Sequence, residues 1–266
     1  MDAKARSIVL AIPGMRMACD SYLNWRNQEY FESVRGARAE LFAQIREGQS
    51  RERCFIVGNG PSLTMSDLQA ISEEDCFGAN HIYKLFDKTS WRPKYYVLQD
   101  RYTKLDRELD SVECEYMFLG SYFMRTSRLA LPENAYAFFD KRDICPKQYL
   151  SFSSDASEFV SVNYTVTYSM MQIAVSLGYR KIFLLGIDHA YAVETNAKGA
   201  VVRRNSVKNH AYQDSQEVVA NVQGMNKAYL SAKRYVDANP GIAIINATRG
   251  GKLEIFPRIS LEEALD

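Results

Sequence analysis

The chain has 266 residues, of which 47% are hydrophobic, so it is long enough for one α/β domain with appendages and a buried core. Lys and Arg (33) balance Asp and Glu (32), and the formal charge of +1 argues against a broad nucleic-acid-binding surface. No apolar run approaches the length that crosses a bilayer, and Pro13 ends the run at residues 8–12 too early for a signal peptide. We therefore expect a cytoplasmic protein and leave peripheral association with the inner face of the membrane open.

The cysteines point to the same compartment. The chain holds five cysteines, widely spaced and without a Cys-x-x-Cys pair. Cys54 and Cys76 lie in apolar, strand-like runs. Buried free thiols in a reducing compartment are the expected state.

Residues 1–50 predict a helical N-terminal extension. Leu41 and Ile45 lie at helical spacing, and Gly48 supplies the end of that helix. This helix is expected to pack on the main domain or to form an oligomer contact. Residues 51–266 are expected to form the catalytic domain.

The stretch at residues 54–62 predicts a buried strand, a glycine turn and a helix that begins at Pro61. Gly58 and Gly60 allow a close approach that a Cβ would forbid, so the amides of the turn, up to Ser62, could face a phosphate. No Gly-Lys-Ser/Thr follows, which excludes a Walker loop, and Leu63 stands where the dinucleotide fingerprint needs a third glycine. A tight turn without a ligand is the alternative interpretation.

Strand-like and helical runs alternate along the rest of the chain. Further strands are predicted at residues 76–80, 94–99, 115–119, 135–139, 181–187 and 242–245. Helices are predicted at residues 67–71, 165–177 and 218–236, with a short terminal helix behind the capping box of Ser260 and Glu263. Residues 192–208 look too irregular for an element and are expected to form a mobile loop over a site.

This alternation predicts an α/β fold, Rossmann-like and doubly wound, with a mainly parallel sheet and helices on both faces. Ligands bind beyond the carboxyl ends of the strands in such sheets. Polar residues follow five of the predicted strands: Asn59, Asn80, Asp100, Asp188 and Asn246. Each alone is a common turn residue, but a parallel sheet would bring all of them to one edge.

Three segments carry a family resemblance. Residues 56–63 (IVGNGPSL), 80–83 (NHIY) and 177–188 (LGYRKIFLLGID) resemble the bacterial sialyltransferases of glycosyltransferase family 42. They equally resemble the superfamily once labelled domain of unknown function 115, which includes flagellin-glycosylation proteins and 6-hydroxymethylpterin diphosphokinases. Residues 246–254 (NATRGGKLE) are more similar to this second group.

The sialyltransferase resemblance implies a Rossmann-like domain that binds a CMP-sugar without a metal. Asn59 would then lie at the nucleotide phosphate and Asn80 on the nucleotide. Asp100 replaces the family's second asparagine contact, and Asn163 stands where the family carries an arginine. The implied nucleotide site comprises Gly58, Asn59, Gly60, Pro61, Ser62, Asn80, Asp100, Asn163 and Thr165.

The resemblance also implies catalytic residues. His210 matches the family's catalytic histidine in kind and place, and an imidazole can take a proton from an attacking hydroxyl. Tyr191 matches the tyrosine after Gly-Ile-Asp with a one-residue offset. His189 is the rival base, and a surface loop histidine is the alternative for His210. Asp188 completes the catalytic set, with a helix cap or an anchor for backbone amides as its alternative.

Three functions follow. The first is a glycosyltransferase with a nucleotide-activated donor, expected to be a CMP-linked acidic sugar, and a glycan or glycolipid acceptor in bacterial surface-glycan (lipopolysaccharide) or glycoprotein assembly. It would need no cofactor. The second is an ATP-dependent 6-hydroxymethylpterin diphosphokinase-like enzyme, in which Asp100 and Asp188 with phosphate oxygens would hold Mg²⁺. The third is a noncatalytic nucleotide-binding assembly protein. Self-association is left open.

Overall fold

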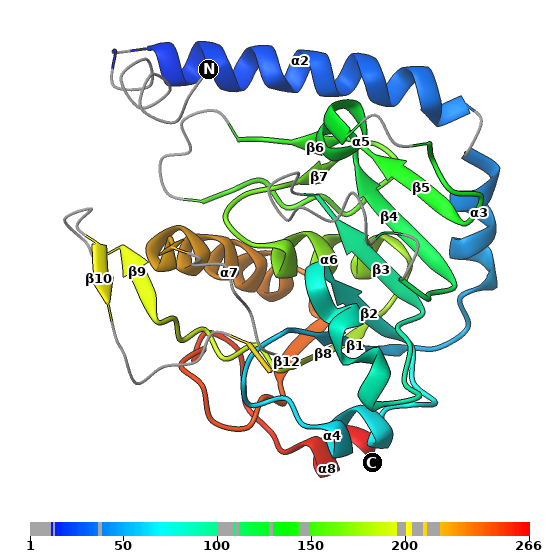
Figure 1. The fold of residues 1–266 in the computed structure, drawn as a ribbon, viewed down its shortest axis with the longest axis vertical. Coiled ribbons are helices and arrows are strands. Elements are labelled where there is room, and N and C mark those ends of the chain that lie inside the picture. The colour runs from blue at the N-terminus through cyan, green and yellow to red at the C-terminus, as the bar shows by residue number, and fades with distance from the viewer. Residues whose placement is uncertain are drawn as a thin grey trace.

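A computed structural model describes residues 12, 14–36, 39–99, 109, 112–127, 130–143, 149–195, 201–203, 210–211 and 219–266. Its centre is a seven-stranded sheet of order β12-β8-β1-β2-β3-β4-β5, in which every neighbouring pair is parallel (Figure 1). The strands are β1 (Arg53–Val57), β2 (Cys76–Ala79), β3 (Tyr95–Leu98), β4 (Tyr116–Gly120), β5 (Ala135–Phe138), β8 (Lys181–Leu185) and β12 (Ala243–Asn246).

Helices cover both faces of this sheet. The core on one face includes residues of α3 (Ala39–Gly48), α6 (Val166–Ser176) and α7 (Val222–Asp237). The other core includes residues of α4 (Met65–Ala70), η2 (Asn80–Lys88), α5 (Ser121–Ser127) and α8 (Leu261–Leu265).

Successive side chains of β1 alternate between the two cores: Cys54 and Ile56 enter one, Phe55 and Val57 the other. A strand that is buried on both faces has a continuous run of apolar residues, so β1 can be recognised in the sequence. The Rossmann-like, doubly wound prediction is confirmed.

The N-terminal extension is helical, as predicted. Helix α2 (Met15–Arg35) packs its Phe31 ring on Phe139, with 6.3 Å between centroids. The Asn24 side chain donates to the Arg142 carbonyl and accepts from the Arg142 N–H, both at 2.8 Å. These contacts join the extension to the far end of the sheet, at β5. No helix among the described residues is long and apolar enough to cross a membrane.

Three sequence-based expectations are wrong. Pro61 does not begin a helix: residues 61–62 form a turn, and α4 starts only at Met65, behind a capping box between Thr64 and Asp67. Residues 192–208 are not simply irregular, because β9 (Val193–Thr195) pairs antiparallel with β10 (Val201–Arg203). The parallel partner of β9 is β11 (Val219–Ala220), so the helix predicted from residue 218 begins later, at Val222.

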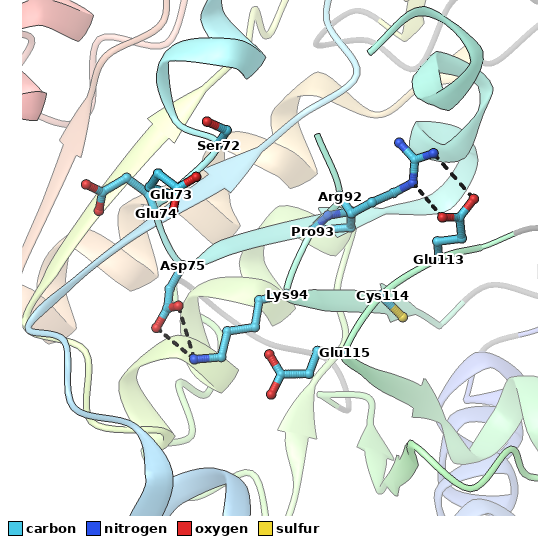
Figure 2. Close-up of a pocket in the computed structure, with 10 residues that line it drawn as sticks. All are labelled: Ser72, Glu73, Glu74, Asp75, Arg92, Pro93, Lys94, Glu113, Cys114 and Glu115. Atoms are coloured by element: carbon cyan, nitrogen blue, oxygen red, sulfur yellow. Dashed lines mark hydrogen bonds and ion pairs between the residues drawn. The ribbon is translucent and has the colours of Figure 1, made fainter. Parts of the chain in front are cut away.

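A polar cavity of about 460 Å³ lies at the amino ends of β2, β3 and β4 (Figure 2). Its walls hold paired charges: the Arg92 guanidinium donates to Glu113 at 3.1 and 3.3 Å, and Lys94 Nζ donates to Asp75 at 3.0 Å. Because ligands of open parallel sheets bind at the carboxyl ends of the strands, this cavity is at the wrong edge for the predicted site.

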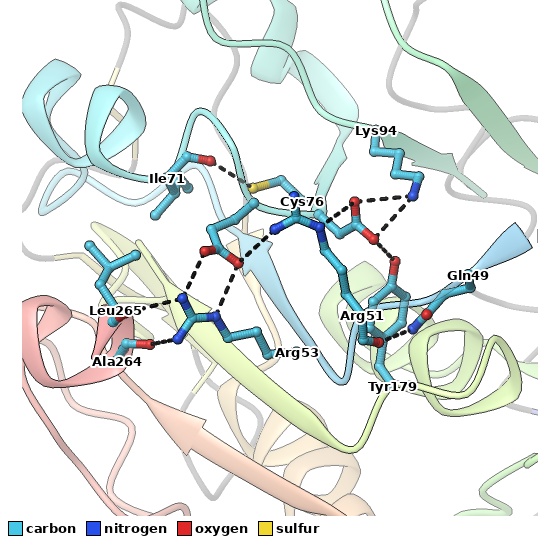
Figure 3. A network of polar contacts seen from close by, with 11 residues as sticks. Gln49, Arg51, Arg53, Ile71, Cys76, Lys94, Tyr179, Ala264 and Leu265 are labelled. Carbon is cyan, nitrogen blue, oxygen red and sulfur yellow. Dashed lines mark hydrogen bonds and ion pairs between the residues drawn. The ribbon is translucent and has the colours of Figure 1, made fainter.

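The same amino edge carries a polar network that ties the first strand to the chain's last helix (Figure 3). Arg53 donates to Glu74 at 2.9 and 3.2 Å and to the carbonyls of Ala264 and Leu265 at 3.2 and 3.0 Å. Asp75 accepts a hydrogen bond from the buried Tyr179 hydroxyl at 2.5 Å. These side chains form hydrogen bonds and ion pairs within the protein, which favours a structural role for this edge of the sheet.

A buried carboxyl gives the fold a pH dependence. Burial raises the pKa of Asp140 to about 6, although hydrogen bonds from Ser121 Oγ (2.5 Å) and Tyr122 N (2.8 Å) oppose the rise. The protonated form is therefore favoured in the folded state. Its stabilising effect is complete below the unfolded pKa of about 3.8 and is lost as the pH rises through 6.

We expect Asp140→Asn to gain unfolding free energy relative to wild type by up to about 3 kcal/mol between pH 4 and pH 7.5. The asparagine keeps an oxygen that accepts from Ser121 and Tyr122 but does not ionise. Urea unfolding of both proteins at several pH values measures the difference. A difference that stays constant across this range would contradict the assignment.

Candidate functional site

The predicted site lies where the order of the sheet reverses. From β1 the chain continues to β2 on one side, whereas β8 flanks β1 on the other side. Loops that leave the carboxyl ends of two such strands form a crevice, and this is the usual ligand site of doubly wound sheets. Residues 58–62 follow β1, and residues 186–189 follow β8.

Gly58 and Gly60 are needed for close contact between these two loops. The Gly58 N–H donates to the Leu185 carbonyl at 2.8 Å, and the Gly60 N–H donates to the Gly186 carbonyl at 2.9 Å. A Cβ on Gly58 would lie 2.4 Å from the Gly186 oxygen, and one on Gly60 would lie 1.8 Å from Asp188 Oδ2. The two glycines therefore give room to residues 186–188 of the protein, rather than to a ligand.

The turn already faces an anion, and that anion is Asp188. Ser62 Oγ donates to Asp188 Oδ2 at 2.7 Å, and the Ser62 N–H is shared between the two carboxylate oxygens at 3.3 and 3.4 Å. Burial raises the pKa of Asp188, and the Ser62 hydrogen bonds oppose that shift. The amide that the sequence suggests for a phosphate is thus occupied by a carboxylate.

Two buried side-chain amide oxygens, on residues 59 and 80, lie at the ends of neighbouring strands. Asn59 Nδ2 donates to the Ala79 carbonyl at 3.1 Å, which joins Asn59 to the end of β2 next to Asn80. Within the described part of the chain, neither Asn59 Oδ1 nor Asn80 Oδ1 accepts a hydrogen bond. Asn80 also has a left-handed backbone, with φ 54°, held by a 2.6 Å hydrogen bond from Tyr96 OH to its carbonyl. Unsatisfied buried acceptors and strained backbone both mark binding sites.

His210 is brought to the same turn. The N–H of its neighbour Ala211 donates to the Asn59 carbonyl at 2.8 Å, and Ala211 packs against the core. The His210 side chain is half-buried. The structure therefore places next to the glycine turn a histidine that lies about 150 residues further along the chain.

His189, the rival base, is held in the interior. It is 7% exposed, has φ 51°, and its Nε2 lies 2.7 Å from Asn226 Oδ1 on α7. Its ring meets Tyr191 and Tyr229 edge to face, with centroids 6.1 and 5.3 Å away. Burial raises the pKa of Tyr191. This packing favours a structural role for His189. Its hydrogen-bond partner Asn226 was not singled out by the sequence.

Three other predicted residues have contacts elsewhere or lie outside the described residues. Asn163 Nδ2 donates to Ser161 Oγ at 3.0 Å and to Asp143 Oδ2 at 3.3 Å. Thr165 is the N-cap of α6, and its hydroxyl accepts from the Thr167 N–H at 3.3 Å. Asp100 lies outside the described residues.

The closing motif at residues 246–252, noted only as a resemblance, supports the loop after β8. Thr248 Oγ1 accepts from the Ile187 N–H at 3.0 Å, and the fully buried Asn246 accepts from the Thr248 N–H at 3.0 Å. The Lys252 N–H donates to the Asp188 carbonyl at 2.7 Å. An asparagine directly after a buried strand is the sequence signal for such a support.

A family model described as 6-hydroxymethylpterin diphosphokinase MptE-like matches residues 28–194, well over half of the chain. The chain belongs to this family. The match confirms the resemblance to the superfamily that includes the hydroxymethylpterin diphosphokinases, and it covers the strands from β1 to β8. His210 and the motif at residues 246–252 lie beyond the matched segment.

Two solved structures are similar to this chain, and the first shares its fold. The MAf glycosyltransferase from Magnetospirillum magneticum AMB-1 aligns over 80% of this chain and 34% of its own, with 17% identity and a TM-score of 0.52. The chain thus spans about a third of that protein's length. The sialyltransferase CstII from Campylobacter jejuni, solved with cytidine-5′-monophosphate, aligns over 80% and 86%, with 16% identity and a TM-score of 0.46. No curated protein gives a significant match.

Proposed function

We propose that this protein is a nucleotide-dependent transferase whose donor is a nucleotide-linked sugar. The observation that carries this proposal is the pair of buried acceptors, Asn59 Oδ1 and Asn80 Oδ1, at neighbouring strand ends of the switch point. Phosphate oxygens only accept hydrogen bonds, so these two atoms suit ribose hydroxyls or the amino group of a base. A nucleoside supplies both kinds of donor.

Both the family and the shared fold support a transferase, but they suggest different transferred groups: a pyrophosphoryl group or a sugar. The chain's family is named for a diphosphokinase, and the MAf protein that shares its fold is a glycosyltransferase. We favour sugar transfer because the MAf protein, which aligns over 80% of this chain, is a glycosyltransferase. A CMP-linked acidic sugar and a glycan or glycolipid acceptor remain the proposed substrates.

In this proposal His210 is the general base. The hydrogen bond from the neighbouring Ala211 N–H to the Asn59 carbonyl supports this assignment. It takes the proton of the acceptor hydroxyl as that oxygen attacks the anomeric carbon, and the nucleotide leaves with its phosphate. Neutral imidazole can do this near pH 7.

Pyrophosphoryl transfer is the second candidate, because the matched family is named for it. Bound Mg²⁺ would neutralise charge on the transferred phosphates. This candidate relies on Asp188 and Asp100 together with phosphate oxygens, and Asp100 lies outside the described residues. Asp188 also already accepts hydrogen bonds from Ser62.

Thermal unfolding with CMP, CDP, UDP, GDP and ATP, each with and without Mg²⁺, tests the proposal, because a ligand that binds only the folded state raises the melting temperature. We expect CMP to raise it without Mg²⁺. Stabilisation by ATP only in the presence of Mg²⁺ supports the pyrophosphokinase instead. If no nucleotide changes the melting temperature, both candidates fail.

Asn80→Gly separates binding from folding at this site. Glycine adopts the left-handed backbone of residue 80 without strain, so we expect the unfolding free energy to stay within about 1 kcal/mol of wild type. Loss of one acceptor for the nucleotide should weaken binding about tenfold. Calorimetric titration with the stabilising nucleotide measures this, and unchanged affinity would remove Asn80 from the site.

A further inference from the structure

The contact between Asp188 and Ser62 joins loops that are 126 residues apart in the sequence. It is the only described contact in which a side chain from the β8 loop accepts hydrogen bonds from the glycine turn, and it uses both the Ser62 N–H and the Ser62 hydroxyl. The missing Cβ of Gly60 makes the room for Asp188 Oδ2. Two residues of the glycine turn, Gly60 and Ser62, are therefore matched to the Asp188 carboxylate.

The carboxylate is itself fixed from behind. The Asp188 carbonyl accepts from the Lys252 N–H at 2.7 Å. Gly251, with φ 76°, approaches so closely that a Cβ would lie 2.9 Å from the Asp188 oxygen and 3.0 Å from its Cα. The backbone that bears Asp188 is thus set by the closing motif, and Asp188 holds its place before any ligand arrives.

We propose that Asp188 is a positioning residue. Its carboxylate fills the anion site formed by Ser62 N and Oγ and holds residues 58–62 in the conformation that directs Asn59 Oδ1 to the ligand. This proposal rests on the proposed function for the identity of the ligand, but the contact between the loops does not. It departs from the catalytic and Mg²⁺-binding roles that the sequence suggests for Asp188.

Hydrogen exchange of the ligand-free protein tests the contact itself. We expect Asp188→Ala to speed exchange in peptides that span residues 58–63 by at least about tenfold, because the Ser62 amide loses its acceptor. Asp188→Asn keeps an acceptor oxygen and should stay near wild type. Equal exchange in Asp188→Ala and wild type would overturn the proposal, whether or not any nucleotide binds.

Nucleotide titration tests the positioning role. With CMP, or with whichever nucleotide stabilises the wild type, Asp188→Ala should lose about tenfold or more in affinity, and added formate should restore much of it by entering the empty anion site. Asp87→Ala is the matched control, because Asp87 is exposed on η2. We expect the Asp87→Ala protein to bind the nucleotide as tightly as wild type, with or without formate. Asp188→Asn should keep both affinity and kcat within about fivefold.

Three results would overturn the proposal. Tighter binding by Asp188→Ala would mean that the carboxylate competes with the ligand's phosphate. Loss of turnover in Asp188→Asn with unchanged affinity would make Asp188 a catalytic residue. Affinity in Asp188→Ala equal to wild type would leave it no role at the site. If Asp188→Ala fails to fold, Ser62→Ala removes the hydroxyl from the same contact and should lower affinity in the same direction.

Discussion

His210→Ala should lower turnover by about two to four orders of magnitude while nucleotide affinity changes little. The Ala211 N–H, which joins this segment to the Asn59 carbonyl, is a backbone group and survives the substitution. The acceptors of the proposed nucleotide site, Asn59 Oδ1 and Asn80 Oδ1, are also untouched. Only the group proposed to take the proton is lost, so the effect should appear in kcat.

His189→Asn is the matched control for that experiment. Asparagine tolerates the left-handed backbone at φ 51° and still reaches toward Asn226, so the fold should survive. We expect turnover within about tenfold of wild type. Single-turnover rates and calorimetric titration of both variants decide the matter. Normal turnover in His210→Ala, together with a large loss in His189→Asn, would move the base to His189.

The strands were predictable because a strand buried on both faces has a continuous run of apolar residues. Each of the seven strands of the main sheet lies inside a predicted run or extends one residue beyond it, and Gly178, with φ 99°, follows α6 as a helix stop should. The capping box of Ser260 and Glu263 is present as expected, because it depends only on residues three apart. Local patterns of this kind need no knowledge of distant contacts.

The start of α4 was mispredicted because two local signals compete. Pro61 fits the first position of a helix, but Thr64 with Asp67 forms a capping box three residues later, and the structure follows the box. The strands of the 192–208 segment were missed because they are three residues long and gain their register from β11, beyond the loop. Pairing with a distant strand leaves little trace in a short window.

The sequence predicted residues of the candidate site, but it did not predict which of them contact one another. Asn59, Asn80, Asp188 and His210 could be chosen because polar residues follow buried strands or match a family's order. The sequence could not show that Asp188 occupies the amide of Ser62, since that contact depends on how two loops 126 residues apart meet. Nor could it show that Asn246 and Thr248 support the loop that carries Asp188.

Gly60→Ala should strongly destabilise the protein. The new Cβ would lie 1.8 Å from Asp188 Oδ2 and 2.5 Å from the Gly186 carbonyl oxygen. Asp188 can rotate away, but the Gly186 oxygen belongs to the backbone between β8 and its loop, so the two loops must separate. We expect a loss of about 2–4 kcal/mol of unfolding free energy, the upper range for overpacking.

Gly241→Ala supplies the control, because nothing lies within 4 Å of its added Cβ and its φ is not in the left-handed region. It should change stability by no more than about 0.5 kcal/mol. Urea unfolding of both variants gives the comparison, and nucleotide titration at low urea adds a second measurement. Gly60→Ala displaces the Asp188 carboxylate from the turn, so it should also weaken nucleotide binding. If the Gly60→Ala protein is as stable as the Gly241→Ala protein, residues 58–62 and 186–188 do not pack closely against each other.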